Sequence, residues 1–145
     1  MPPDRTAIRD YMTPQPHTIA AGQTLHAAHQ VMNALQVRHL PVLEGHQLVG
    51  MLSLRDLAMI EAVEVVHPDL ARVADVMSAP AFVVSPDASL ACVSEEMAAR
   101  KLGAAVVVEG PSVVGIFTTV DALWALAEMS RERDAASAQP ARTPA

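Results

Sequence analysis

The chain has 145 residues, the size of one globular domain, and its net charge is −6. No cluster of Lys or Arg offsets that charge, so we expect neither nucleic acid nor an anionic membrane as a partner. Cys92 is the single cysteine, which excludes an intrachain disulfide and a cage of several thiolates around a metal. No apolar run approaches the roughly 18 residues of a membrane span. Because residues 1–5 also lack the apolar stretch of a secretory signal, we expect a cytoplasmic protein.

The first half of the chain predicts a mixed unit of strands and helices. Leu25, Ala28, Met32 and Leu35 are spaced by three, four and three residues, which predicts an amphipathic helix that Thr24 caps. The turn-forming segment Glu44–His46 predicts a hairpin between two apolar runs. In chain order we expect an N-terminal arm (1–9), a short strand (Thr18–Ile19), that helix, two strands (His39–Leu43 and Gln47–Leu52) and a helix (Leu57–Val65).

The second half predicts the same series of elements. Leu90, Val93 and Met97 repeat the helical spacing, with Ser89 or Asp87 as the cap. In chain order we expect a connector (66–73), a short strand (Phe82–Val84), that helix, two strands (Ala104–Val108 and Val113–Phe117), a helix (Ala122–Met129) and a mobile C-terminal tail (131–145).

The two halves are copies of one another, 65 residues apart and without a gap. Asp10-Tyr11-Met12 returns as Asp75-Val76-Met77, and 11 of the 47 pairs from Asp10 to Asp56 are identical. Such an internal repeat determines the architecture. One copy alone is about the size at which an isolated core becomes marginal. We therefore predict an α+β fold of two β-α-β-β-α repeats (10–65 and 74–130), related by pseudo-twofold symmetry and sharing one core.

Each copy carries a hydroxyl followed three residues later by a carboxylate, Ser53-x-x-Asp56 and Thr118-x-x-Asp121, where a strand ends and a helix begins. Free N–H groups and the helix dipole attract an anion such as phosphate there, while the carboxylate can accept both hydrogen bonds of a ribose diol. The same pattern is also the capping box, in which the two side chains satisfy backbone donors. The spacing alone leaves both interpretations open.

Other reactive side chains give weaker signals. His26 and His29 could chelate a metal from one helical face, but the neighbouring sequence offers no carboxylate or thiol ligand. Cys92 is expected to be a small buried hydrophobic residue. His17 and His39 are most simply solvated or hydrogen-bonded histidines. Neither a catalytic triad nor a phosphate-binding glycine loop can be recognised. We therefore predict no metal site and no enzyme.

The motifs together resemble a tandem pair of CBS domains over residues 10–127. The motifs that carry the resemblance, in order and twice, are Asp10-Tyr11-Met12-Thr13-Pro14, Arg38-His39-Leu40-Pro41-Val42 and Gly50-x-x-Ser53-x-x-Asp56, with their counterparts Asp75-Val76-Met77-Ser78 and Gly115-x-x-Thr118-x-x-Asp121. The resemblance implies a regulatory module with two clefts between the repeats. Such clefts bind adenosine compounds, among them AMP, ADP, ATP and S-adenosylmethionine.

The resemblance also implies roles for single residues. Asp56 and Asp121 would hold ribose diols, with Ser53 and Thr118 near ribose or phosphate. One cleft would join Thr118, Asp121 and Ile116 to a base-contacting wall of Thr13, His17, Thr18, Val37 and Arg38. The other would join Ser53, Asp56 and Met51 to Ser78, Phe82, Val83, Leu102 and Gly103. Arg38 is a phosphate contact or a solvated surface residue. Gly103-Ala104-Ala105-Val106 replaces Arg38-His39-Leu40-Pro41 in the second copy, so we expect the two clefts to differ.

The expected function is that of a sensor. An adenine nucleotide would act as regulatory ligand, no cofactor would be required, and an effector protein in trans would receive the signal. The resemblance further implies a homodimer that pairs through helices, for which the small apolar faces Ala27-Ala28-Val31 and Ala91-Val93-Ala98 are suitable. Two alternatives remain open. One is a ligand-independent scaffold, and the other is a metal or redox sensor that uses His26, His29 and Cys92.

Overall fold

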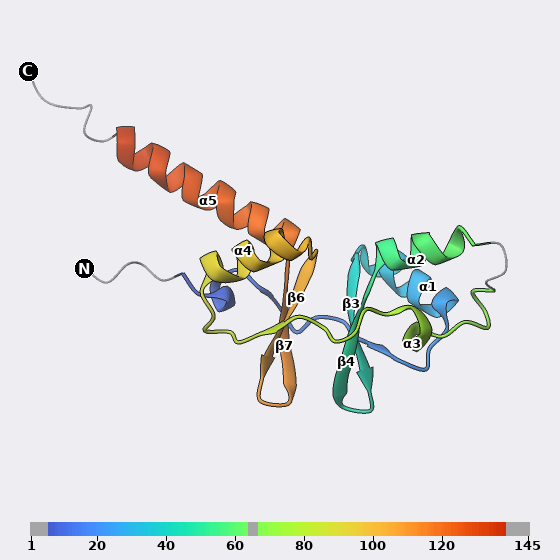
Figure 1. Ribbon diagram of the computed structural model, residues 1–145. Coiled ribbons are helices and arrows are strands. Elements are labelled where there is room, and N and C mark those ends of the chain that lie inside the picture. Colours follow the sequence, from blue (N-terminus) through green and yellow to red (C-terminus); the bar gives the residue numbers. More distant parts are fainter. Residues whose placement is uncertain (1–5, 64–66, 139–145) are drawn as a thin grey trace, which may run out of the picture.

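The structure is a computed structural model that describes residues 6–63 and 67–138. The first repeat contains a 3-10 helix (Ile8–Asp10), β1 (Thr13–Pro14), β2 (Ile19–Ala20), α1 (Leu25–Leu35), β3 (His39–Glu44), β4 (Gln47–Ser53) and α2 (Leu54–Glu61). The second contains α3 (Val73–Val76), β5 (Val83–Val84), α4 (Leu90–Arg100), β6 (Ala104–Glu109), β7 (Ser112–Thr118) and α5 (Thr119–Ala138). Figure 1 shows the two hairpins side by side with helices at their outer sides. The predicted α+β repeat is confirmed.

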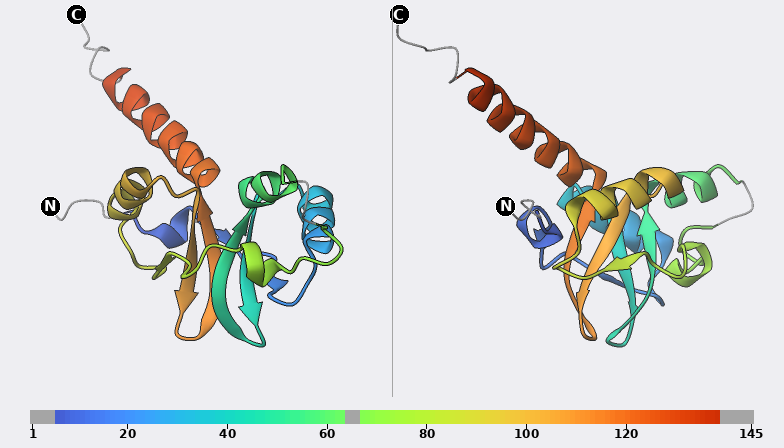
Figure 2. Two further views of the ribbon diagram at one scale, coloured as in Figure 1. Left: turned by 45° about the vertical axis from the view of Figure 1, so that its right-hand side comes forward. Right: turned by 60° about the vertical axis from the view of Figure 1, so that its left-hand side comes forward.

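Two small sheets form the centre of the molecule. Their strand orders are β2-β3-β4 and β1-β7-β6-β5, with parallel pairing of β2 to β3 and of β5 to β6. The antiparallel hairpins have matching registers, since His39 pairs with Ser53 and Ala104 with Thr118. Both carry an irregularity at the same point of the repeat, after Val42 and after Val107. The two sheets lie against each other, with the helices outside them (Figure 2).

The segment before each repeat packs against the other repeat. The Ile8 N–H donates to the Ala88 carbonyl (2.9 Å), and the Ile8 side chain is fully buried in the core of the second repeat. In the same way the Val73 N–H donates to the Gln23 carbonyl (2.8 Å), and Val73 is fully buried in the core of the first repeat. The interpretation of residues 1–9 as an arm is therefore wrong for residues 6–9. Residue 73, expected in a connector, is a core residue.

The buried hydrophobic residues of the described chain fall into three clusters. One lies inside the first repeat and includes Leu40 and Leu52, and a second lies inside the second repeat around Phe117. The third joins the two sheets and consists of Met51, Ala104, Val106 and Ile116. The expected shared core is thus organised as two repeat cores connected by a small central cluster.

A glycine in each repeat allows the crossing segment to come close to the sheet. A Cβ on Gly50 would lie 2.7 Å from the Met77 sulfur and 2.8 Å from the Ser78 carbonyl oxygen. A Cβ on Gly115 would likewise collide with the sulfur of Met12. Both glycines therefore stand where the strand that leads to the hydroxyl-carboxylate motif must pass under the chain of the other repeat.

α1 and α4 begin after the caps that the sequence predicts. The Ala27 N–H donates to the Thr24 hydroxyl (3.1 Å) and the Cys92 N–H to that of Ser89 (3.3 Å), so these caps are confirmed. Asp87, the alternative cap, instead forms an exposed ion pair with Arg9.

The two helices that follow the hairpins differ from the prediction. α2 begins at Leu54 rather than Leu57 because Ser53 caps it. α5 continues to Ala138, so the prediction of a mobile tail from residue 131 is wrong for residues 131–138. No Gly or Pro interrupts the Ala-rich segment from Thr119 to Ala138, which explains its helicity. Residues 139–145, the rest of that tail, lie outside the described residues. Within the described chain, none of these helices combines the length and the apolar character that a membrane crossing requires.

Candidate functional site

The two hydroxyl-carboxylate pairs are capping boxes in the folded chain. The Ser53 N–H donates to Asp56 Oδ2 (2.9 Å), and the Asp56 N–H donates to the Ser53 hydroxyl (3.0 Å). Thr118 and Asp121 form the same pair at 2.9 and 3.2 Å. Capping uses one carboxylate oxygen of Asp56, and Oδ1 accepts no hydrogen bond from the described residues. The cap therefore holds this carboxylate in position without exhausting its capacity to bind a ligand.

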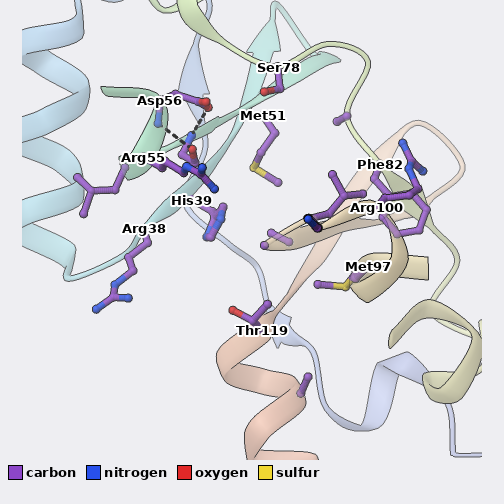
Figure 3. A pocket seen from close by; sticks show the side chains of 18 of the residues that line it. Arg38, His39, Met51, Arg55, Asp56, Ser78, Phe82, Met97, Arg100 and Thr119 are labelled. Atoms are coloured by element: carbon purple, nitrogen blue, oxygen red, sulfur yellow. Dashed lines mark hydrogen bonds between the residues drawn. The ribbon is translucent and has the colours of Figure 1, made fainter. Parts of the chain in front are cut away.

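A large open cleft of about 1190 Å³ lies between the repeats at the start of α2. Eight of the site residues expected from the sequence line it, and they come from both repeats. These are Arg38, Met51, Ser53, Asp56, Ser78, Phe82, Leu102 and Gly103. Figure 3 shows Met51 and His39 on one side of the open space and Phe82, Met97 and Arg100 on the other. Distant segments that the resemblance to CBS domains places in one cleft are thus brought together.

Main-chain hydrogen bonds hold the two walls of this cleft together. The Met51 N–H donates to the Ser78 carbonyl (2.9 Å), and the Ser78 N–H donates back to the Met51 carbonyl (2.8 Å). This bridge has the same place in its repeat as the pairing of Thr13 with Ile116 between β1 and β7. On the second-repeat wall, the guanidinium of Arg100 stacks on the Phe82 ring at 5.0 Å. The first wall therefore rests on β4, and the main-chain bridge fixes the segment of the second repeat that carries Ser78 beside it.

His39 explains why the second copy departs from the first at Gly103. A Cβ on Gly103 would lie 2.7 Å from Nε2 of His39, so a larger residue there would displace the imidazole. Burial lowers the pKa of His39, and the charge of Arg38 adds to this effect while Asp56 opposes it. The ring is therefore neutral at neutral pH. His39 is a cleft-lining residue that we did not include among the expected contacts.

The second hydroxyl-carboxylate pair has different surroundings. The Thr13 hydroxyl, from the other repeat, lies 3.2 Å from Asp121 Oδ1, while the Thr118 hydroxyl lies 3.1 Å from Oδ2. Both carboxylate oxygens of Asp121 are thus engaged, unlike those of Asp56. Ile116 is buried in the central cluster between the sheets, where its backbone pairs with that of Thr13.

Several other expected contacts lie elsewhere. Arg38 lines the cleft of Ser53 and Asp56 rather than the one to which we assigned it. Val37 packs against the core of the first repeat, and His17 and Thr18 are exposed. Their expected place in the cleft of Thr118 and Asp121 stays a prediction. Val83 is also exposed, and it lines a separate hollow of about 780 Å³ beside the two hairpin turns.

The sequence analysis missed several cleft residues. Arg55, Arg100 and Lys101 supply positive charge, and Met59 and Leu123 supply apolar surface at the mouth. Arg55 could have been recognised because it lies inside the Ser53-x-x-Asp56 motif. The other four depend on how α2, α4 and α5 are placed around the cleft.

Three expectations about the outer helices need correction. Ala28 and Val93, expected on a dimer-facing surface, are buried within their own repeats. Cys92, expected to be buried, is exposed. His29 does have a carboxylate beside it, since its Nδ1 lies 2.8 Å from Glu61 Oε1. Even so, no group of three or more His, Cys, Asp or Glu that could hold a metal occurs in the described part of the chain.

Comparison with known proteins identifies the family. The model of the CBS domain matches residues 8–63 and again residues 73–128. The chain belongs to the CBS domain family. The CBS domain-containing protein YhcV of Bacillus subtilis is 31 % identical over 127 residues, which cover 88 % of this chain and 89 % of YhcV.

Solved CBS structures have the same fold. The Vibrio cholerae protein called AcuB is 28 % identical with a TM-score of 0.77, and the match covers 89 % of this chain and 96 % of that one. The CBS domain pair of MJ0100, solved with 5′-methylthioadenosine and S-adenosylmethionine, is 21 % identical with a TM-score of 0.75. That match covers 86 % of this chain and 98 % of the solved domain pair, and at this identity it shows the fold alone. CBS pairs are regulatory modules, and this chain has the architecture of one.

Proposed function

We propose that this CBS pair is a sensor that binds an adenosine-containing ligand in the Ser53–Asp56 cleft and signals to a partner protein. The observation that carries the proposal is the carboxylate of Asp56, which the cap holds in place while Oδ1 remains available. A vicinal diol needs such a fixed acceptor, because both of its hydroxyls donate to the same group. The adenosine ligands of MJ0100, a protein with the same fold, agree with this choice of ligand.

The remaining cleft residues are suitable for the other parts of such a ligand. Met51, Phe82 and Leu102 offer apolar surface from both repeats, between which a planar base would be buried. Ser53 lies at the start of α2, where the helix dipole favours an anionic group. The main chain of Ser78 is already hydrogen-bonded to Met51, with its carbonyl accepting the Met51 N–H. The side-chain hydroxyl of Ser78 is therefore the group that would contact the ligand.

Ligand binding would act by shifting a conformational equilibrium. The walls of the cleft belong to different repeats, so a ligand that contacts both walls binds best when the repeats are closed on it. It stabilises that arrangement by its difference in affinity for the closed and open forms. No chemical reaction is required of the protein.

The output surface would be formed by α2 and α5. Met59 on α2 and Leu123 and Trp124 on α5 are 65 %, 63 % and 67 % exposed, which is unusual for large apolar side chains. Met59 and Leu123 also line the cleft, so closure would move this surface directly. We propose that a second copy covers it in a homodimer and that an effector protein in trans reads the dimer.

A thermal-shift screen of the chain against AMP, ADP, ATP, S-adenosylmethionine and 5′-methylthioadenosine tests the proposal. A ligand at one hundred times its dissociation constant adds about 2.7 kcal/mol to the free energy of unfolding, a shift of several degrees. Asp56→Ala should lose this shift. Ser53→Ala removes the capping hydroxyl and about 1 kcal/mol of stability, but it leaves the carboxylate, so the ligand shift should persist.

The alternative scaffold function predicts a different result. If the hydroxyl-carboxylate pairs are only caps, Asp56→Ala and Ser53→Ala would lower the melting temperature alike, and none of the five compounds would raise it. The exposed apolar surface on α2 and α5 would then be the functional feature of the chain.

A further inference from the structure

We infer that the Ser53–Asp56 cleft selects ligands that carry two or more phosphates and that its pseudo-symmetric counterpart does not. This inference rests on the proposed function, because it specifies which adenosine compounds the cleft prefers. It starts from the charges of the lining. Four cationic side chains surround the cleft, Arg38, Arg55, Arg100 and Lys101, and Asp56 is the one acidic residue among the lining residues. Four cations against one carboxylate give a formal charge of +3, on a chain whose net charge is −6.

Most of this positive charge is not neutralised by the protein. Arg100 lies 3.3 Å from Glu96 and stacks on Phe82, so part of its charge is already used. Arg38, Arg55 and Lys101 form no ion pair with any of the described residues. All three are exposed residues that line one cleft without carboxylate partners, so they repel one another, though solvent screens much of that repulsion. An anion bound between them removes that repulsion, and each added phosphate removes more of it.

The repeat provides an internal control for this charge. The residues 65 positions away from Arg38, Arg55, Arg100 and Lys101 are Gly103, Val120, Leu35 and Gln36. All four counterparts are uncharged. Lys101 and Gln36 even share the same left-handed backbone conformation at the end of their helices, with φ of 56° and 55°, so only the side chain differs. Similar architecture thus carries cations around one cleft and none at the equivalent positions of the other.

The placement of the cations favours a chain of phosphates over a single one. Arg38 and Arg55 come from the first repeat and Arg100 and Lys101 from the second, and Figure 3 shows Arg55 and Arg100 on opposite sides of the open space. One phosphate cannot reach cations on both walls as well as a di- or triphosphate can. Arginine is also suited to phosphate because its fork can donate two parallel hydrogen bonds. The equivalent positions around the Thr118–Asp121 pair hold no cations, and the Thr13 hydroxyl already donates to Oδ1 of Asp121.

Isothermal titration of the full chain with adenosine, AMP, ADP and ATP at one ionic strength tests the inference. We expect the dissociation constant to fall at every added phosphate, and by at least tenfold from AMP to ATP. The double variant Arg55→Gln/Lys101→Gln should raise the dissociation constant for ATP about tenfold. This size assumes that each screened contact between a cation and a phosphate contributes about fivefold or less to the affinity. The affinity of this variant for adenosine should not change. Arg133→Gln, an exposed arginine outside the cleft, is the matched control and should bind all four compounds normally.

The outcomes separate the inference from the proposed function. If adenosine and ATP bind equally well and both need Asp56, the inference is overturned while the proposed function stands. If none of the four compounds binds, the inference is overturned, and the proposed function is overturned with it when S-adenosylmethionine and 5′-methylthioadenosine also fail to bind. Inorganic triphosphate distinguishes the remaining case: tight binding of triphosphate that persists in Asp56→Ala, with no gain from the nucleoside, would support the phosphate preference and overturn the proposed adenosine ligand. Loss of ATP binding in Asp121→Ala but not in Asp56→Ala would overturn the choice of cleft.

Discussion

Gly50→Ala is expected to destabilise the fold at the point where the two repeats cross. The new Cβ would lie 2.7 Å from the Met77 sulfur and 2.8 Å from the Ser78 carbonyl oxygen. The Met77 side chain can rotate away. The Ser78 carbonyl cannot move alone, because it accepts the Met51 N–H at 2.9 Å. Relief of the contact therefore requires a shift of the main chain of β4 or of the crossing segment.

The expected size of this effect follows from the cost of overpacking. Forcing one extra methyl group into a well-packed site costs about 1–3 kcal/mol. For a chain of this length, 1 kcal/mol changes the melting temperature by about 2–4 °C. Thermal unfolding of Gly50→Ala, followed by circular dichroism, should therefore show a melting temperature lowered by roughly 2–12 °C.

Gly22→Ala is the matched control for this experiment. A Cβ at Gly22 has no heavy atom within 4 Å, and its backbone does not have the positive φ that strains an alanine. This variant should be unchanged or more stable by up to about 1 kcal/mol. Equal melting temperatures of the two variants would refute the close crossing of the repeats. Adding Met77→Ala to Gly50→Ala should restore only part of the stability, because the Ser78 carbonyl remains.

The other predictions concern Ile8 in the core of the second repeat, His39 in the cleft and Trp124 on α5. Ile8→Ala should lower the free energy of unfolding in urea by about 2–5 kcal/mol, because this side chain is fully buried in the second repeat. Burial lowers the native pKa of His39 below 6.5, so the unfolded chain binds the proton more readily. The contribution of neutral His39 to the free energy of unfolding should be complete above about pH 6.5 and be lost as the pH falls through the lower native pKa. His39→Gln should therefore make the free energy of unfolding less dependent on pH in this range. Trp124→Glu should convert the proposed dimer to a monomer in sedimentation at tens of micromolar, because it places a charge on the exposed apolar surface.

Each of these predictions has a control in the same part of the molecule. Arg9→Ala removes an exposed ion pair and should cost less than 1 kcal/mol; a cost equal to that of Ile8→Ala would contradict the burial argument. Gln30→Ala, at an exposed residue of α1 that carries no titratable group, should leave the pH dependence unchanged. Arg133→Glu, farther along α5, should leave the sedimentation unchanged. A dimer that survives Trp124→Glu would show that the two copies meet elsewhere.

The hydroxyl-carboxylate motif shows how far local pattern reaches. Its spacing left a cap and a ligand contact as alternatives, and the structure shows that Ser53 and Asp56 do form the cap. Only the tertiary structure shows that Asp56 also lines a cleft whose other wall belongs to the second repeat. The length of α5, by contrast, was available from the sequence, since no breaker separates Thr119 from Ala138.

The sequence by itself determined the repeat, the order of its elements, the caps and the family. Hydrophobic periodicity, turn residues and motif spacing are local properties, and they can be read directly from one amino-acid sequence. Only the tertiary structure shows that Ile8 packs in the core of the second repeat and Val73 in the core of the first. It also decided that Arg100 and Lys101 face the same cleft as Arg55. These residues are far apart in the sequence. A contact between distant segments produces no repeating pattern of apolar residues in either segment, so the sequence alone does not reveal it.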